Sequence, residues 1–268
     1  MPQRLYNTFC GRCLLKILTA PAISKMAGAF MNSAASKLYI KPFIKKNQID
    51  MTDYKIENWS CFNEFFTRRL KSGKRNPVMN ENVLIAPCDG YLSVYNIDKY
   101  TRLTIKNSSY TVETLIRNKT IADEYMDGTC LVFRLTPADY HRYVYPDNGA
   151  KGKNIFIPGV LHTVRPVAHE HYPVFKTNSR EYTVLRTNNF DDVVFMEVGA
   201  MLVGKICNYH SEHNFLRGEE KGRFEFGGST IVMLLKKDVA KIDDDILEAS
   251  LRDEEFQIKL GERIGIRI

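Results

Sequence analysis

The residues best suited to chemistry form a Gly-Gly-Ser-Thr run at positions 227–230, between two stretches with the pattern of strands. Phe224 and Phe226 alternate with charged residues, as in a half-buried strand, and residues 231–235 are continuously apolar, as in a strand covered on both faces. A serine hydroxyl is a weak nucleophile that needs a base, and a glycine before it leaves its carbonyl open to attack. The run is either a simple glycine bend or a place where Ser229 attacks the peptide bond of Gly228.

Five blocks of sequence decide between these alternatives. They are FNEFFTRRL (62–70), APCDGYL (86–92), DYHRYVYPDNG (139–149), EVGAMLVGKI (197–206) and GEEKGRFEFGGST (218–230). In this order they resemble the phosphatidylserine decarboxylase family. The resemblance implies a proenzyme that cuts itself between Gly228 and Ser229, with Ser229 becoming a covalently bound pyruvoyl group. It also implies mature chains 1–228 and 229–268 that stay associated, as a homodimer of the cleaved pair.

The same resemblance implies the reaction. The pyruvoyl carbonyl would form a Schiff base with the amine of phosphatidylserine and draw electrons from the bond to the carboxylate. Carbon dioxide would leave, and phosphatidylethanolamine would be released. His141 is expected to return the proton to the substrate carbon. Asp89 is expected to be the carboxylate of a Ser-His-Asp arrangement for self-cleavage.

Which histidine belongs to that Ser-His-Asp arrangement stays open. The family block usually runs His-Arg-x-His, whereas here His141 is followed at the second position by Val144, which cannot accept a proton. Either His141 serves both steps, or His162 in GVLHTVRP (159–166) takes the vacant place. His169 and His171 are weaker candidates. The remaining pair, His210 and His213, is expected to lie in a polar surface loop, and no metal site is expected because no Cys/His spacing matches a known one.

Periodicity predicts an α+β fold that is mainly β: N-terminal helices followed by an antiparallel sandwich or barrel-like catalytic core. Residues 1–72 are expected to be helical, including a run over Asp50–Leu70, and residues 71–82 form a linker by composition. The domain that follows spans 83–268, with helices expected at Val112–Asn118 and Asp243–Asp253. The expected strands are Val83–Ala86, Tyr91–Ile97, Leu103–Lys106, Thr129–Leu135, Gly159–Val164, Tyr182–Arg186, Val193–Val198, Leu202–Ile206, Arg223–Phe226 and Thr230–Leu235.

The distribution of charged residues along the chain predicts what the first domain, residues 1–72, binds. Residues 1–49 hold eight Lys and Arg, and all 31 Asp and Glu lie beyond them. Amphipathic helices with this basic excess can dock on an anionic membrane surface that holds phosphatidylserine. No run is apolar enough to span a bilayer, so a peripheral position on the cytoplasmic side is expected. Because the basic excess is confined to this apolar helical region, nucleic-acid binding is not expected.

Two other functions fit the sequence less well. One is a pyruvoyl-dependent decarboxylase of a soluble amino acid, which the basic N-terminal helices argue against. The other is a β-rich membrane-binding protein that no longer cleaves itself, as the valine at position 144 would suggest. The retention of Asp89, His141, Gly228 and Ser229 argues against that second alternative.

Overall fold

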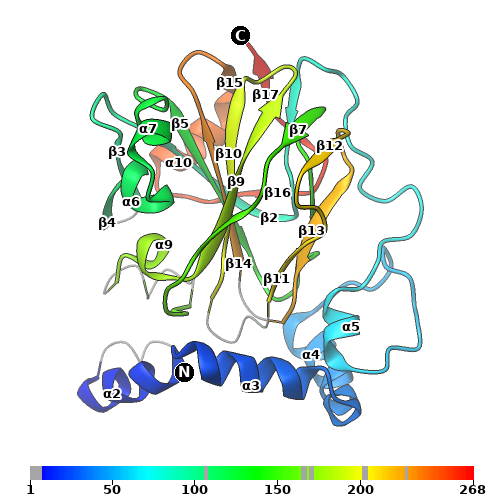
Figure 1. Cartoon of the computed structure of the whole chain (residues 1–268). Coiled ribbons are helices and arrows are strands. Elements are labelled where there is room, and N and C mark those ends of the chain that lie inside the picture. Colours follow the sequence, from blue (N-terminus) through cyan, green and yellow to red (C-terminus); the bar gives the residue numbers. More distant parts are fainter. Residues whose placement is uncertain (1–7, 106–107, 164–167, 169–171, 201–204, 227–228) are drawn as a thin grey trace.

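A large antiparallel sheet forms the centre of the molecule (Figure 1). The computed structural model describes residues 8–105, 108–163, 168, 172–200, 205–226 and 229–268. The strands of the sheet are β2 (Gly90–Asn96), β5 (Thr129–Leu135), β7 (Gly149–Lys151), β8 (Ile155–Ile157), β9 (Arg180–Thr187), β10 (Asp192–Val198), β12 (His213–Phe215), β14 (Ser229–Leu235) and β16 (Phe256–Ile258). Their order is β12-β7-β9-β10-β14-β5-β2-β16, with β8 paired to β9. Within the described residues this order has two ends, so the sheet is open rather than a closed barrel.

Strand β14 lies in the middle of this sheet and is buried on both faces. Ile231 and Met233 belong to one hydrophobic cluster, and Val232 and Leu234 belong to the other. The prediction from the continuously apolar sequence is therefore confirmed: the strand is covered on both faces, because each face packs against its own hydrophobic cluster. The strand is hydrogen-bonded to β10 on one side and to β5 on the other.

Three smaller sheets and short helices complete the β-rich part. One sheet has the order β1-β17-β15, another β11-β13-β6, and the third pairs β3 with β4. Their bounds are β1 (Val83–Ile85), β3 (Arg102–Ile105), β4 (Ser108–Thr111), β6 (Arg142–Val144), β11 (Ile206–Asn208), β13 (Glu220–Phe224), β15 (Ala240–Ile242) and β17 (Arg263–Arg267). The helices are α6 (Val112–Ile116), α7 (Lys119–Asp123), α9 (Val174–Thr177) and α10 (Asp244–Leu251).

The N-terminal region is a set of helices that lies across the lower end of the sheet in Figure 1. They are α2 (Phe9–Leu18), α3 (Pro21–Met31), the 3-10 helix η1 (Ala34–Tyr39), α4 (Ile40–Asn47) and α5 (Phe62–Phe66). The aromatic residues of α5 are core residues, as predicted: Phe62, Phe65 and Phe66 are fully buried and pack edge-on against Phe43. Among the described residues, every helix is too short or too polar to cross a bilayer.

The α+β, mainly β class is confirmed, but several local predictions were wrong. Strand β13 ends at Phe224, two residues before the predicted end, and helices α7 and α9 were not predicted. Of the expected strand Leu202–Ile206, residues 202–204 lie outside the described part of the chain, and β11 begins at Ile206. Asp50–Leu70 is helical only over α5, because the Asp50 carboxylate accepts the Thr52 N–H in a turn and Tyr54 forms a bridge with Leu70. In the expected strand Gly159–Val164, Val160 makes only an isolated bridge to Asn178, and Val164 lies outside the described residues. By contrast, β5 has the predicted bounds, and β14 begins one residue earlier than predicted.

Candidate active site

Five neighbouring strands have an end at the same edge of the central sheet. The register pairs Ser229 with Leu135, Thr230 with Val198, and Val198 with Arg180. On the other side of β5, Tyr91 pairs with Arg134, which puts the start of β2 beside Leu135. We call this the Ser229 edge. In Figure 1 it is the lower end of the sheet, the end that faces the N-terminal helices.

Ser229 is the first residue of β14 and is fully buried. Its Oγ has no hydrogen-bond partner among the described residues, and the same holds for the hydroxyl of the neighbouring Thr230. A buried hydroxyl without a partner costs free energy, so such a group is expected where it has a chemical task. Gly228, the other residue of the expected cleavage site, lies outside the described residues.

His141 reaches this edge from the loop between β5 and β6. Its Nδ1 lies 2.9 Å from the carbonyl oxygen of Asp139 and therefore donates to it. The ring is fully buried and lies 4.0 Å from the ring of Phe66, centroid to centroid. Burial, together with the positive charge of Arg68, lowers the pKa of His141 to about 3. The imidazole is thus neutral, and its Nε2 is a buried acceptor without a hydrogen-bond partner in the described part of the chain.

The segment that leads to the cleavage site runs directly past His141. The Phe224 N–H donates to the His141 carbonyl at 2.9 Å. Two residues further on, the Phe226 N–H donates to Oδ1 of Asn63, and the Phe226 ring packs against Phe66. Three residues before Ser229, the chain is therefore fixed beside Phe66, the ring that packs against the imidazole.

Asp89 lies immediately before β2 and is buried at the same edge. Arg75 donates hydrogen bonds to both of its carboxylate oxygens, from Nε to Oδ1 at 3.0 Å and from Nη2 to Oδ2 at 2.9 Å. The Leu260 N–H donates to Oδ1 at 2.8 Å. Asp89 is thus hydrogen-bonded to Arg75 and Leu260. Among the described residues no hydrogen bond or ion pair joins it to His141, so its expected role in orienting a histidine stays a prediction.

His162 comes to the edge from the opposite side of β14. The Asn178 side chain holds its backbone, accepting from the His162 N–H at 3.0 Å and donating to the His162 carbonyl at 2.8 Å. The same amide donates to the carbonyl of Gly199, the residue that follows β10. Burial lowers the pKa of His162, and its ring stacks on Tyr172. The other two expected substitutes, His169 and His171, lie outside the described residues.

Val144, at the position of the usual second histidine, is buried in the aromatic cluster around α5. Its N–H donates to the carbonyl of Pro87, which places it two residues from Asp89 along that neighbouring segment. Position 144 therefore lies beside the Asp89 segment, but the valine side chain there contributes only packing. Of the histidines that the structure describes at the edge, His141 is the one with an unpartnered acceptor nitrogen.

Two charged residues of the site were missed by the sequence analysis. Arg75 lies in the stretch assigned to a linker, yet it binds both Asp89 and Asp53. Arg68 lies within the run Asp50–Leu70 that was expected to be helical, but it is buried and donates to the carbonyls of Ala138 and Asp139. Arg68 thus supports the same carbonyl that fixes the His141 ring. The sequence feature that could have indicated this role is the position of Arg68 within the FNEFFTRRL block.

The edge holds a buried serine hydroxyl and a neutral imidazole, the two kinds of group that enzymes with an activated serine use. Comparisons with known proteins show which family the chain resembles. The sequence profile of the phosphatidylserine decarboxylases matches residues 62–266. The chain therefore belongs to the phosphatidylserine decarboxylase family.

Three relatives illustrate the similarity. Phosphatidylserine decarboxylase proenzyme 2 of Clostridium acetobutylicum is 48% identical over 262 residues, covering 97% of this chain and 90% of that protein. The phosphatidylserine decarboxylase proenzyme of Clostridium botulinum strain Langeland is 41% identical over 266 residues, with 97% and 90% covered. That of Clostridium kluyveri is 40% identical over 269 residues, with 97% and 91% covered.

Proposed function

We propose that this chain is a phosphatidylserine decarboxylase proenzyme that cuts itself at Gly228–Ser229 and then converts phosphatidylserine to phosphatidylethanolamine. The observation that carries the proposal is the pair of unpartnered buried atoms at one edge, Ser229 Oγ and His141 Nε2. The family and the names of the relatives agree with it.

His141 is the proposed base for self-cleavage. Its Nε2 takes the proton of Ser229 Oγ, which attacks the carbonyl carbon of Gly228. The C–N bond breaks, its nitrogen takes the proton, and an ester replaces the amide. Loss of the Ser229 Cα proton then expels the Gly228 carboxylate and leaves a dehydroalanine at position 229. Water replaces its nitrogen, which leaves as ammonia, and a pyruvoyl group remains at the start of the short chain.

The surroundings of Ser229 fit a group of this kind. The residue is buried, and the strand that follows is hydrogen-bonded on both sides, so the short chain stays in the sheet after cleavage. The pyruvoyl group supplies a carbonyl that accepts electrons from the substrate carbon. His141 is the proposed donor of a proton to that carbon once its Nε2 carries one, and the ring of Phe66 packs against its imidazole.

A cavity beside the Ser229 edge suits a lipid headgroup. It measures about 540 Å³ and lies between α3 and the loops that follow β8 and β10. Lys25 and Lys205 supply positive charge for a phosphate, and Gly199 brings the cavity to the edge. Helices α2 and α3 also expose apolar residues, among them Leu14, Met26 and Phe30. These features support peripheral binding of the N-terminal helices to an anionic membrane that presents phosphatidylserine.

The test compares two serine variants by intact-mass spectrometry and by release of carbon dioxide from phosphatidylserine. The unmodified protein should give two chains, the shorter lighter by one ammonia than residues 229–268. Ser229→Ala should remain a single 30.9 kDa chain without activity. Ser93→Ala, which removes another buried hydroxyl on β2, should cleave normally. An uncut unmodified chain, or full activity of Ser229→Ala, would refute the proposal.

A further inference from the structure

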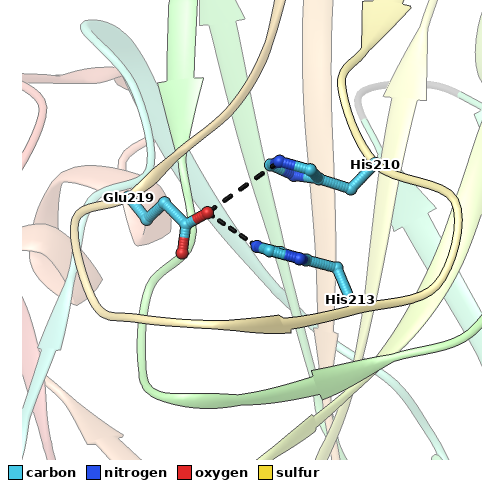
Figure 2. A group of neighbouring side chains, drawn as sticks. All are labelled: His210, His213 and Glu219. Carbon is cyan, nitrogen blue, oxygen red and sulfur yellow. Dashed lines mark hydrogen bonds and ion pairs between the residues drawn. The ribbon is translucent and has the colours of Figure 1, made fainter.

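The loop between β11 and β13 brings three metal-binding side chains together, His210, His213 and Glu219 (Figure 2). One ligand atom of each lies within 4.8 Å of the other two. Oε1 of Glu219 is 2.7 Å from Nε2 of His213 and 4.0 Å from Nε2 of His210. We propose that these three residues bind a zinc ion, with solvent completing the coordination.

The separations suit a tetrahedral ion. With zinc bonds of about 2.0–2.1 Å, neighbouring ligand atoms are roughly 3.3 Å apart. The two N–O separations, 2.7 and 4.0 Å, lie on either side of this value, so movements of less than about 1 Å would reach it. The imidazole rings are now stacked, with centroids 3.7 Å apart, and they would open as the ion enters. The side chains are 28 to 32% exposed, so the fourth position faces water.

Outer contacts already orient two of the ligands. The Leu216 N–H donates to Oε2 of Glu219 at 2.9 Å, which leaves Oε1 turned toward the histidines. The Tyr145 hydroxyl lies 3.3 Å from Nδ1 of His210, which leaves its Nε2 for the ion. Contacts of this kind fix the ring orientation and tautomer of metal ligands.

The backbone of the loop is held as well. Lys151 Nζ donates to the carbonyls of His210 and Ser211, at 2.8 and 2.5 Å. The Gly218 N–H donates to the Tyr145 carbonyl at 3.0 Å, and β12 pairs with β7. A loop fixed in this way loses little conformational freedom when it binds an ion, which favours affinity.

The proposed ion would lie far from the processing site. Strand β13 leads from Glu220, next to the loop, to Phe224 near His141, and its four steps of about 3.3 Å span roughly 13 Å. Zinc would therefore cross-link the segment between the paired strands β11 and β13, and it would stiffen the strand that leads toward Ser229. From the sequence only a polar loop was expected here, because no Cys/His spacing matches a known metal site.

The experiment is a titration of metal-free processed protein with zinc chloride, in competition with a chromophoric chelator. Glu219→Gln removes the proposed carboxylate but keeps an acceptor for the Leu216 N–H. Glu212→Gln removes the same charge from an exposed position on the same loop. We expect zinc binding to weaken at least tenfold in Glu219→Gln and in His213→Asn, and less than twofold in Glu212→Gln.

Two results would overturn the proposal. Unchanged affinity in both Glu219→Gln and His213→Asn would place any bound zinc elsewhere in the chain. An equal loss of zinc affinity in Glu212→Gln would show that Glu219 acts only through its negative charge and is not a ligand of the ion. The melting temperature of each variant without metal shows whether it is folded, and His213→Asn carries the test if Glu219→Gln is not. Self-cleavage is measured separately, so either result leaves the proposed function unaffected.

Discussion

The imidazole of His141 is fixed by the backbone of Asp139, whose carbonyl oxygen accepts from Nδ1 at 2.9 Å. A carbonyl can only accept, so the proton of the neutral ring is on Nδ1 and the lone pair is on Nε2. Arg68 donates to the same carbonyl at 3.1 Å and adds a positive charge nearby. The ring is thereby held in the tautomer that a base requires, and protonation is disfavoured.

This relationship predicts that His141 does not titrate near neutral pH. Burial lowers its pKa to about 3, below the ordinary value of 6.5. In uncut Ser229→Ala protein, the NMR signal of the His141 ring should stay constant between pH 8 and 5. Because the folded pKa lies below the unfolded one, His141 contributes stability that is complete above pH 6.5 and is lost as the pH falls toward 3. A ring signal that titrates with a midpoint near 6.5 would contradict the assignment.

Substitutions at positions 141 and 144 test which residue is the base. His141→Ala should stop self-cleavage, because it removes the unpartnered Nε2 at the Ser229 edge. Position 144 lies beside the Asp89 segment, so a histidine there can restore the usual second histidine of the family. We therefore expect the double variant His141→Ala, Val144→His to regain cleavage, measured as the fraction of split chain over time. Normal cleavage in the single His141→Ala variant would transfer the role to another histidine, with His162 tested next.

The ion pair of Asp89 with Arg75 predicts a large loss of stability in Asp89→Asn. Both side chains are nearly buried, at 6 and 11% exposure, so the variant leaves the guanidinium short of a partner. Removing one partner of a buried pair costs on the order of 3 kcal/mol. Urea unfolding in the Ser229→Ala background, where the chain stays in one piece, measures the difference.

Asp53→Asn is the matched control for that measurement. Asp53 binds the same guanidinium, but it is 23% exposed, so its loss should cost less than about 1 kcal/mol. Asp89→Asn should also slow self-cleavage, whereas Asp53→Asn should not. Equal stability losses in the two variants would show that burial does not distinguish the two carboxylates.

Local sequence patterns and motifs were sufficient to predict part of the fold and part of the site. The apolar run of β14 predicted a strand buried on both faces, because that pattern reports the environment of each residue directly. The motif blocks also predicted Ser229 and His141, which the structure brings to one edge. Those blocks lie far apart in the chain, and the register of β2, β5 and β14 brings them together.

Contacts between distant segments were not predictable in the same way. Arg75 lies in a stretch with the composition of a linker, and only the fold places it on Asp89. Asp50–Leu70 has helical spacing, but turn contacts and a bridge between Tyr54 and Leu70 outweigh helix propensity there. Glu219 joins the two histidines of its loop because the hairpin folds back, which residue spacing did not reveal.

The last prediction concerns the basic N-terminal helices. Lys16 on α2 and Lys25 on α3 are exposed, next to exposed apolar residues such as Leu14 and Met26. A lysine near an anionic membrane contributes about 1 kcal/mol of binding, so replacing both by glutamine should weaken binding roughly 30-fold. Sedimentation with vesicles that contain phosphatidylserine measures this change, and the difference should shrink at high salt. Lys119 and Lys237, exposed on the β-rich domain, are the matched control pair. If glutamine at these two positions weakens binding as much, the N-terminal helices are not the docking surface.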